Sequence, residues 1–237
     1  MSVSVVVRRA LARFLTREAG RQTRHSFSFG SSYDPDRLSF GPLVALNDDL
    51  LGRDAGYPEH EHSDLVIVTW VVTGCLEHTD PSGTTRLPAG QLAVTATGSG
   101  TTHSERAAGE VTRFVQMWLT PDASGGNPRR EVGTPDLTRQ GWVTVAGDGA
   151  LALGIAGARL EIADLDAGET VPLPDAPRVY VFVVSGALIR SSLAEPLATG
   201  DAFEITDDAD ADAGRARGDL SVTAAVPTQL LAWSFAG

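Results

Sequence analysis

The chain has no lysine, a single cysteine and no long apolar run, and each scarcity excludes a class of protein. With only Cys75 it cannot close an internal disulfide, so it is not a small secreted domain held together by disulfides. No apolar stretch of about 18 residues is present to cross a membrane as a helix. The apolar run Val3–Val7 is too short for a secretory signal. We therefore expect a cytoplasmic protein without a membrane partner.

Positive charge is also scarce. The 19 basic residues are all arginine and are outnumbered by 30 acidic residues, which gives a net charge of -11. Because affinity for nucleic acids comes mainly from basic side chains that displace counterions from phosphates, direct nucleic-acid binding is disfavoured. The acidic run Asp207–Asp212 lacks the glutamate that closes a calcium-binding loop, so we interpret it as a solvated loop.

Glycine and proline, in contrast, are plentiful and spread along the chain. The 237 residues include 25 glycines and 13 prolines, a distribution typical of many short strands joined by turns. Leu65–Thr79 is the strongest strand signal, and Gly74 within it predicts a bend. Phe40–Asp49 is a second predicted strand, ending in a polar turn. The sequence therefore predicts an all-β fold.

The strand pattern occurs twice. Three segments of the first half align in order with three of the second: Val66–Leu76 with Val179–Leu188, Leu87–Gln91 with Leu197–Asp201, and Val115–Leu119 with Leu230–Ser234. Self-similarity of this kind indicates one β architecture built twice. We predict an N-terminal domain over residues 1–125 and a C-terminal domain over residues 137–237, joined by a linker near residues 121–136.

Side chains that could bind a metal recur at alternate positions of two predicted strands. In an extended strand His60 and His62 share one face and Glu61 points to the other, and His103 shares a face with Glu105. Three imidazoles and one carboxylate suit a first-row transition metal and can leave positions for water, oxygen or substrate. Two alternatives remain for Glu105: a surface carboxylate paired with an arginine, or a group that orients a ligand.

The second copy of the repeat does not carry these ligands. The repeat offset takes His60 and His62 to Pro172 and Pro174, and no histidine follows His103. We therefore expect the C-terminal domain to lack the metal site.

Three further residues are assigned structural roles. His78 stands at the end of a long strand beside a turn, where a solvated histidine is the ordinary finding. His25 is expected to order its strand by hydrogen bonding, and Cys75 to be a small buried hydrophobic residue.

These motifs, in this order, resemble the pirin family, two-domain members of the cupin superfamily of small β-barrels. The first half of the chain resembles it closely and the second half in its barrel pattern. The resemblance implies two tandem cupin, or jelly-roll, domains packed together. The matching segments are His25–Phe29, Phe40–Leu43, Asn47–Asp49, His60–His62, Glu77–Asp80 and Gly98–Glu105.

The resemblance also implies a ligand set and an activity. In pirins two histidines of one motif and the histidine and glutamate of another bind the metal, which corresponds here to His60, His62, His103 and Glu105. The implied metal is Fe(II), with Mn, Ni, Cu, Co and Zn as alternatives. The implied activity is that of a quercetin 2,3-dioxygenase acting on a small aromatic substrate and O2. Other members are transcription cofactors, which implies an alternative: a non-catalytic, redox-sensing regulator with a protein partner.

Two positions depart from the family pattern. Glu61 replaces the usual proline between the two histidines, and Val66 replaces a usual glutamate. Losing that carboxylate removes a group that could orient a ligand, which favours the regulator slightly. For the enzyme, Glu105 is the expected catalytic residue, a general base for a substrate hydroxyl whose pKa the metal lowers. A structural zinc site is disfavoured because such sites favour cysteine-rich shells.

Overall fold

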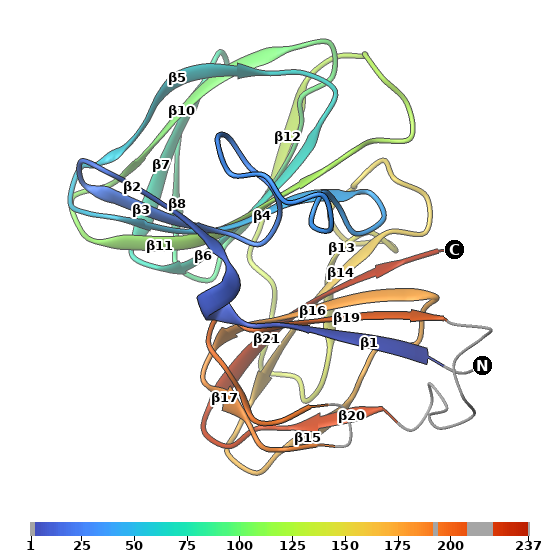
Figure 1. Ribbon diagram of the computed structural model, residues 1–237. Helices are drawn as coiled ribbons and strands as arrows, with labels where there is room; N and C mark the ends of the chain where they lie inside the picture. The colour runs from blue at the N-terminus through green and yellow to red at the C-terminus, as the bar shows by residue number, and fades with distance from the viewer. Residues whose placement is uncertain (1–2, 192–193, 208–219, 237) are drawn as a thin grey trace. The chain divides into compact units, whose positions relative to one another are not determined.

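The computed structural model describes residues 3–191, 194–207 and 220–236, and most of them form β-strands (Figure 1). The acidic run beyond Asp207 lies outside the described residues. The chain divides into two compact units. The first comprises Arg13–Pro135 and Leu151–Ile155, and the second comprises the N-terminal strand, Asp136–Ala150 and the chain from Ala156 onward. Among the described residues no helix has the length and apolar character needed to cross a membrane.

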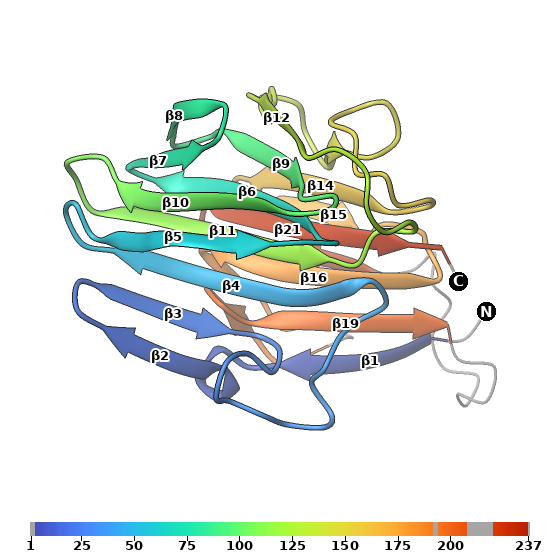
Figure 2. The ribbon, with the colours of Figure 1, turned by 90° about the horizontal axis from the view of Figure 1, so that it is seen from above.

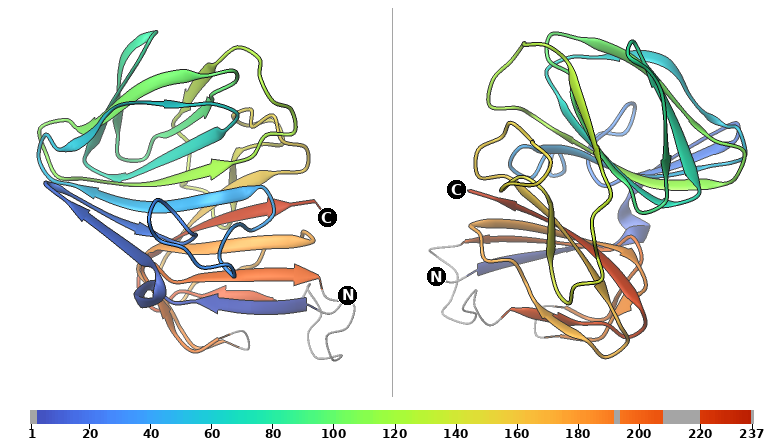
Figure 3. Two further views of the ribbon diagram at one scale, coloured as in Figure 1. Left: turned by 45° about the horizontal axis from the view of Figure 1, so that its top comes forward. Right: turned by 180° about the vertical axis from the view of Figure 1, so that it is seen from behind.

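The first unit is a barrel of two antiparallel sheets. A four-stranded sheet in the order β5-β10-β7-β8 lies across from a seven-stranded sheet in the order β12-β9-β6-β11-β4-β3-β2 (Figures 1 and 3). Figure 2 shows the strands of the smaller sheet side by side. The strands are β2 Phe14–Glu18, β3 Arg21–His25, β4 Leu43–Leu51, β5 Gly56–His62, β6 Val66–Thr73, β7 Cys75–Asp80, β8 Gly83–Pro88, β9 Leu92–Ala96, β10 Thr101–Ala107, β11 Thr112–Leu119 and β12 Arg129–Gly133.

Apolar side chains from both sheets fill part of this barrel. Leu51, Val71 and Phe114 of the larger sheet pack with Leu76 and Leu87 of the smaller one, and all five are fully buried. Alternation along each strand directs these residues inward. Elsewhere the same alternation turns polar side chains inward, and these build the site described below.

Strand β4 is longer than the sequence predicts. We expected a polar turn at its end, but β4 continues to Leu51, and Asp49 is buried with an exposed fraction of 2%. The reason is its neighbour: β3 pairs Thr23 with Asp49, and the Thr23 hydroxyl donates to Asp49 Oδ1 at 2.5 Å. A buried carboxylate is tolerated where such donors satisfy it.

The second unit is a barrel with an apolar interior. Its main sheet has the order β1-β19-β16-β21-β14-β13, and two short ribbons, β15-β20 and β17-β18, complete it. Buried side chains such as Val181, Phe203, Leu230 and Ala232 form its core. The elements are β1 Val3–Arg8, a 3-10 turn at Ala10–Ala12, β13 Val143–Ala146, β14 Arg159–Leu165, β15 Thr170–Pro172, β16 Arg178–Ser185, β17 Ala187–Leu188, β18 Leu197–Ala198, β19 Ala202–Asp207, β20 Ser221–Thr223 and β21 Thr228–Phe235.

The internal repeat is visible in the strand order. The run β9-β6-β11-β4 of the first unit corresponds to β19-β16-β21-β14 of the second. Gly74 and Gly186 occupy equivalent bends with φ of 76° and 86°, which only glycine adopts readily. In each case the amide of the next residue donates to a threonine hydroxyl at 3.1 Å, that of Thr112 or Thr228. The predicted all-β fold of two cupin-type barrels is confirmed.

The units differ from the predicted domain boundaries at two places. Val3–Arg8 falls within the predicted N-terminal domain, yet β1 pairs along its whole length with β19 of the second unit. The pairing is held by Arg8, which donates through Nε and Nη2 to the carboxylate of Glu204, each at 2.9 Å. Conversely, Leu151–Ile155 falls within the predicted C-terminal domain but groups with the first unit.

Candidate metal site

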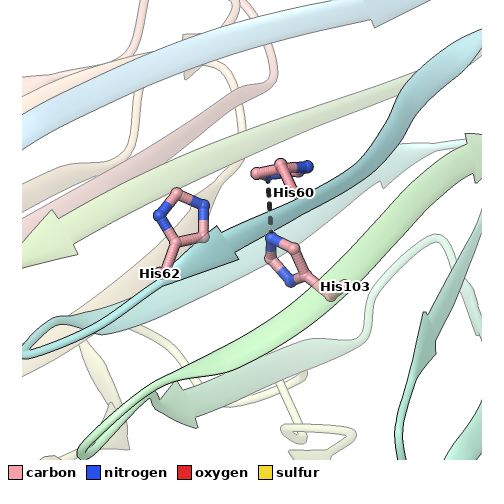
Figure 4. A group of neighbouring side chains, drawn as sticks. All are labelled: His60, His62 and His103. Atoms are coloured by element: carbon pink, nitrogen blue, oxygen red, sulfur yellow. Dashed lines mark hydrogen bonds between the residues drawn. The ribbon is translucent and has the colours of Figure 1, made fainter.

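Strands β5 and β10 of the first unit bring three histidines together. They pair antiparallel with His103 opposite His60 and Thr101 opposite His62. His60 and His62 share a face of β5, as strand alternation predicts, and His103 approaches them from β10 (Figure 4). One ligand nitrogen from each ring lies within 4.8 Å of the others, and the Nε2 atoms of His60 and His103 are 3.0 Å apart.

The protonation of His60 is fixed by its neighbour. Its Nδ1 lies 2.7 Å from the carbonyl oxygen of Pro58, an acceptor, so Nδ1 carries the proton and donates. In the neutral ring Nε2 then has a lone pair, directed at His103. His62 Nε2 and His103 Nδ1 are buried without a hydrogen-bond partner. The arrangement at His60 fits a metal ion, because the hydrogen bond on its Nδ1 orients Nε2 for coordination.

Glu105 lies two residues after His103, behind an irregularity in the pairing of β5 with β10. Its side chain is buried, and the Gln116 amide donates to both carboxylate oxygens, at 3.1 and 3.0 Å. The Trp118 indole donates to Gln116 Oε1 at 3.0 Å, which sets the direction of that amide. Glu105 does not join the group of His60, His62 and His103. It belongs to a second, overlapping group with His103 and His78.

The expectation for His78 is wrong. We predicted a solvated histidine, but its exposed fraction is 3%. Strand β7 pairs with β10 so that His78 stands opposite Glu105, and its Nδ1 lies 3.4 Å from Glu105 Oε1. Its Nε2 lies 3.5 Å from Asp80 Oδ2, without the geometry of a hydrogen bond. The signal available in the sequence was the Glu77–Asp80 motif itself, which is one of the segments shared with the family.

The electrostatics of the site favour neutral imidazoles beside an ionised carboxylate. Burial lowers the pKa of His103 to about 4 and also lowers that of His62. For Glu105, burial acts to raise the pKa, but the hydrogen bond with His78 and the electrostatic interactions with His103 and His78 outweigh it, so the pKa is lowered. These are the protonation states in which imidazole and carboxylate bind a metal.

A cavity of about 470 Å³, which we call the histidine cavity, opens beside these residues. Its size suits a small organic molecule. The wall carries the two histidines of β5 together with aromatic and polar side chains of β3, β4 and β11. Among the lining residues are Thr23, Asn47, Tyr57, His60, His62 and Trp118.

Two other cavity residues have well-defined partners. His25 contacts Asn47 Oδ1 through Nδ1 and Thr16 Oγ1 through Nε2, both at 2.9 Å, so it orders its strand as predicted and also lines the cavity. Asp49 was missed as a site residue. Tyr57 donates to its Oδ1 at 2.5 Å, and burial raises the pKa of Asp49 to about 7 despite this bond.

Comparison with known proteins identifies the family. The family model described as Pirin matches residues 5–119. A Mycobacterium tuberculosis protein named "Putative quercetin 2,3-dioxygenase Rv0181c" is 40% identical over 243 residues, which cover 98% of this chain and 96% of the relative. The chain belongs to the pirin family. An Escherichia coli O157:H7 protein named "Quercetin 2,3-dioxygenase" is 31% identical over 199 residues, covering 79% of this chain and 86% of the relative.

A solved pirin structure matches the whole chain. The crystal structure of the bacterial pirin YhhW from Escherichia coli, in complex with nickel(II), superposes with a TM-score of 0.85 at 26% identity, covering 98% of this chain and 99% of that one. In the chain described here, Val66, which departs from the expected family pattern, is buried in β6 opposite Ala96 and Leu119. Its surroundings on the neighbouring strands are therefore apolar.

Proposed function

We propose that this pirin is a metal-dependent dioxygenase that takes a flavonol-like or other enolisable substrate in the histidine cavity. The observation that supports this most is the convergence of three imidazoles, two of which line a cavity large enough for such a molecule. Relatives named as quercetin 2,3-dioxygenases support the substrate class.

In this proposal His60, His62, His103 and Glu105 hold one divalent transition metal. The donor set fits such an ion, because imidazole and carboxylate are ligands for Fe, Mn, Ni, Co, Cu and Zn alike. We propose Fe(II), and the nickel(II) complex of the Escherichia coli relative shows that a pirin can hold another ion. When bound, the metal would supply Lewis acidity that lowers the pKa of a substrate hydroxyl.

The protein groups then have distinct roles. Glu105 accepts the hydroxyl proton, since its carboxylate is ionised and stands beside His103. Gln116 donates to both oxygens of that carboxylate and keeps it aligned while the proton is transferred. Trp118 and Phe29, whose ring centroids are 5.1 Å apart, form an apolar wall of the cavity that excludes water from the reacting atoms.

A non-catalytic alternative rests on Val66. Without the usual carboxylate, the chain could bind a metal and change its surface with the oxidation state of iron, and so regulate a protein partner. Oxygen uptake in the presence of quercetin distinguishes the two functions: turnover selects the dioxygenase, whereas redox-dependent partner binding without turnover selects the regulator.

The metal is tested first. Mass spectrometry of protein purified without added metal or chelator is expected to find about one equivalent of a transition metal per chain. The His60→Ala/His62→Ala double variant is expected to lose it. Equal metal content in the two proteins would contradict the ligand assignment.

Glu105→Gln tests the base. We expect it to lower the rate of quercetin-dependent oxygen consumption by at least about 100-fold, because the amide cannot accept the proton. Unchanged metal content together with unchanged oxygen consumption would contradict the role of Glu105.

A further inference from the structure

The first unit has a second cavity that the proposed function does not use. This arginine cavity has a volume of about 670 Å³ and is lined by residues of β7, β9, β10 and β12 and of the turns beside them. His103 lines it, whereas His60 and His62 line the histidine cavity. The lining residues that matter here are Asp80, Ser82, Thr102, His103, Arg129 and Arg130.

Buried polar atoms without partners gather at this cavity. Nε and Nη2 of Arg130 are buried and make no hydrogen bond, and the same holds for His103 Nδ1 and His78 Nε2, whose side chains also line the cavity. A buried guanidinium edge without an acceptor is costly, because the donors have lost their contact with water. Among these atoms Arg130 contributes two donors, and arginine cannot give up its charge.

Two other charged groups of the cavity, Arg129 and Asp80, already have partners. Arg129, next in the chain, donates to Glu131 Oε1 at 2.7 Å and to the Ala152 carbonyl at 3.2 Å. Asp80 Oδ1 accepts from the Ser82 amide at 2.8 Å and from the Ser82 hydroxyl at 2.5 Å. No ion pair joins Arg130 to a carboxylate within the described part of the chain.

We propose that the arginine cavity binds a small organic monocarboxylate whose two oxygens are received by Nε and Nη2 of Arg130. These nitrogens form one edge of the guanidinium, the geometry that matches a carboxylate with two parallel hydrogen bonds. Asp80 and Glu61 also line the cavity, and their negative charge disfavours a dianion such as phosphate. The hydroxyls of Ser82 and Thr102 offer further polar contacts, and the volume accommodates an acid with a single aromatic ring.

Calorimetric titration of the full chain with benzoate tests this site. Benzamide is an uncharged probe of the same shape, and inorganic phosphate is a competing anion. We expect benzamide and phosphate each to bind at least about tenfold more weakly than benzoate, because neither offers a singly charged carboxylate to the guanidinium edge. Phosphate binding as tight as that of benzoate would contradict the monocarboxylate assignment.

Variants identify the residue. Arg130→Gln is expected to weaken benzoate binding by at least about tenfold, and Arg130→Lys, which keeps the charge without the fork, by an intermediate factor. The matched control is Arg86→Gln, an arginine of β8 that does not line the cavity and whose Nε donates to Glu77 Oε2 at 3.2 Å, and it should bind benzoate as the wild type does. Equal binding by wild type and Arg130→Gln, or no binding by the wild type at millimolar benzoate, would overturn the proposal.

Two further measurements separate this site from the metal. A carboxylate could also coordinate an ion in the histidine cavity, so the His60→Ala/His62→Ala variant is titrated as well and should retain its affinity for benzoate. Loss of binding there, with Arg130→Gln unaffected, would place benzoate on the metal instead. Benzoate should also raise the Tm of the wild type and leave that of Arg130→Gln unchanged, since a ligand stabilises only the state that binds it.

Discussion

At the scale of single residues, the candidate site depends on groups that support the proposed metal ligands as much as on these ligands themselves. His60 and His62 could be found from sequence because strand alternation is local. His78 could not, because its burial comes from the cross-strand register that sets it opposite Glu105, a residue 27 positions away. Asp49 was missed for a similar reason, since Thr23 and Tyr57, which satisfy its carboxylate, lie on other strands.

His78→Ala is predicted to weaken metal binding without removing a ligand of the proposed set. Groups that hold a ligand in place typically contribute about 10–100-fold to metal affinity, and His78 contacts the Glu105 carboxylate. Competition with a chelator of known affinity measures the effect. Thr79→Ala, at the neighbouring exposed position, is the control and should bind metal as the wild type does. Equal affinity in His78→Ala would show that Gln116 alone positions Glu105.

Asp49 predicts an unusual dependence of stability on pH. Its pKa is raised from 3.8 to about 7, so between these values the folded state holds a proton that the unfolded state has released. The contribution of Asp49 to the free energy of unfolding is therefore greatest below pH 4 and falls as the pH rises to 7, by on the order of 4 kcal/mol. Denaturant unfolding of wild type and Asp49→Asn across this range measures it. The free energy of unfolding should fall less steeply with rising pH in Asp49→Asn than in the wild type. Parallel slopes in the two proteins would contradict the assignment.

At the scale of elements, the approach of β5 to β10 controls the site. Gly56 of β5 stands opposite Arg106 of β10, and a Cβ at Gly56 would lie 2.0 Å from the Glu105 carbonyl oxygen. Only glycine permits this spacing, and the same pairing sets His60 against His103. The sequence predicts that both strands carry metal ligands, but it does not show how closely the strands approach, because that depends on the backbone of both strands.

Gly56→Ala is accordingly predicted to push β10 away from β5. We expect a loss of stability of about 2–4 kcal/mol, typical of overpacking against backbone, and a weaker affinity for the metal. Gly133→Ala is the matched control, because its Cβ would meet the flexible end of the Leu151 side chain at 3.3 Å. Thermal unfolding and metal titration of the two variants separate strand displacement from the general effect of replacing glycine. Similar losses in both would contradict the steric explanation.

At the scale of the whole molecule, the repeat was visible in the sequence, but the pairing of the N-terminal strand β1 with β19 of the second unit was not. The recurring Gly74 and Gly186 mark equivalent bends, and such local signals survive in the sequence of each copy. Val3, Val5 and Val7 alternate in a way that fits the edge of either barrel. Their actual neighbours lie near residue 205, and no local pattern encodes a pairing over that separation.

This pairing predicts which unit depends on the first residues of the chain. Removal of residues 1–9 would expose the edge of β19 and the apolar core that Val3, Val5 and Val7 cover. It would also leave Glu204 and Asp201 without their ion-pair partners Arg8 and Arg9. Burying a valine contributes about 1.5 kcal/mol or more, so the second unit should lose several kcal/mol. Hydrogen exchange should therefore accelerate in β16, β19 and β21 of the truncated protein, while β5 and β10 keep their protection. Faster exchange in β5 and β10 instead would mean that the N-terminal strand supports the barrel that carries the candidate metal site, contrary to its pairing.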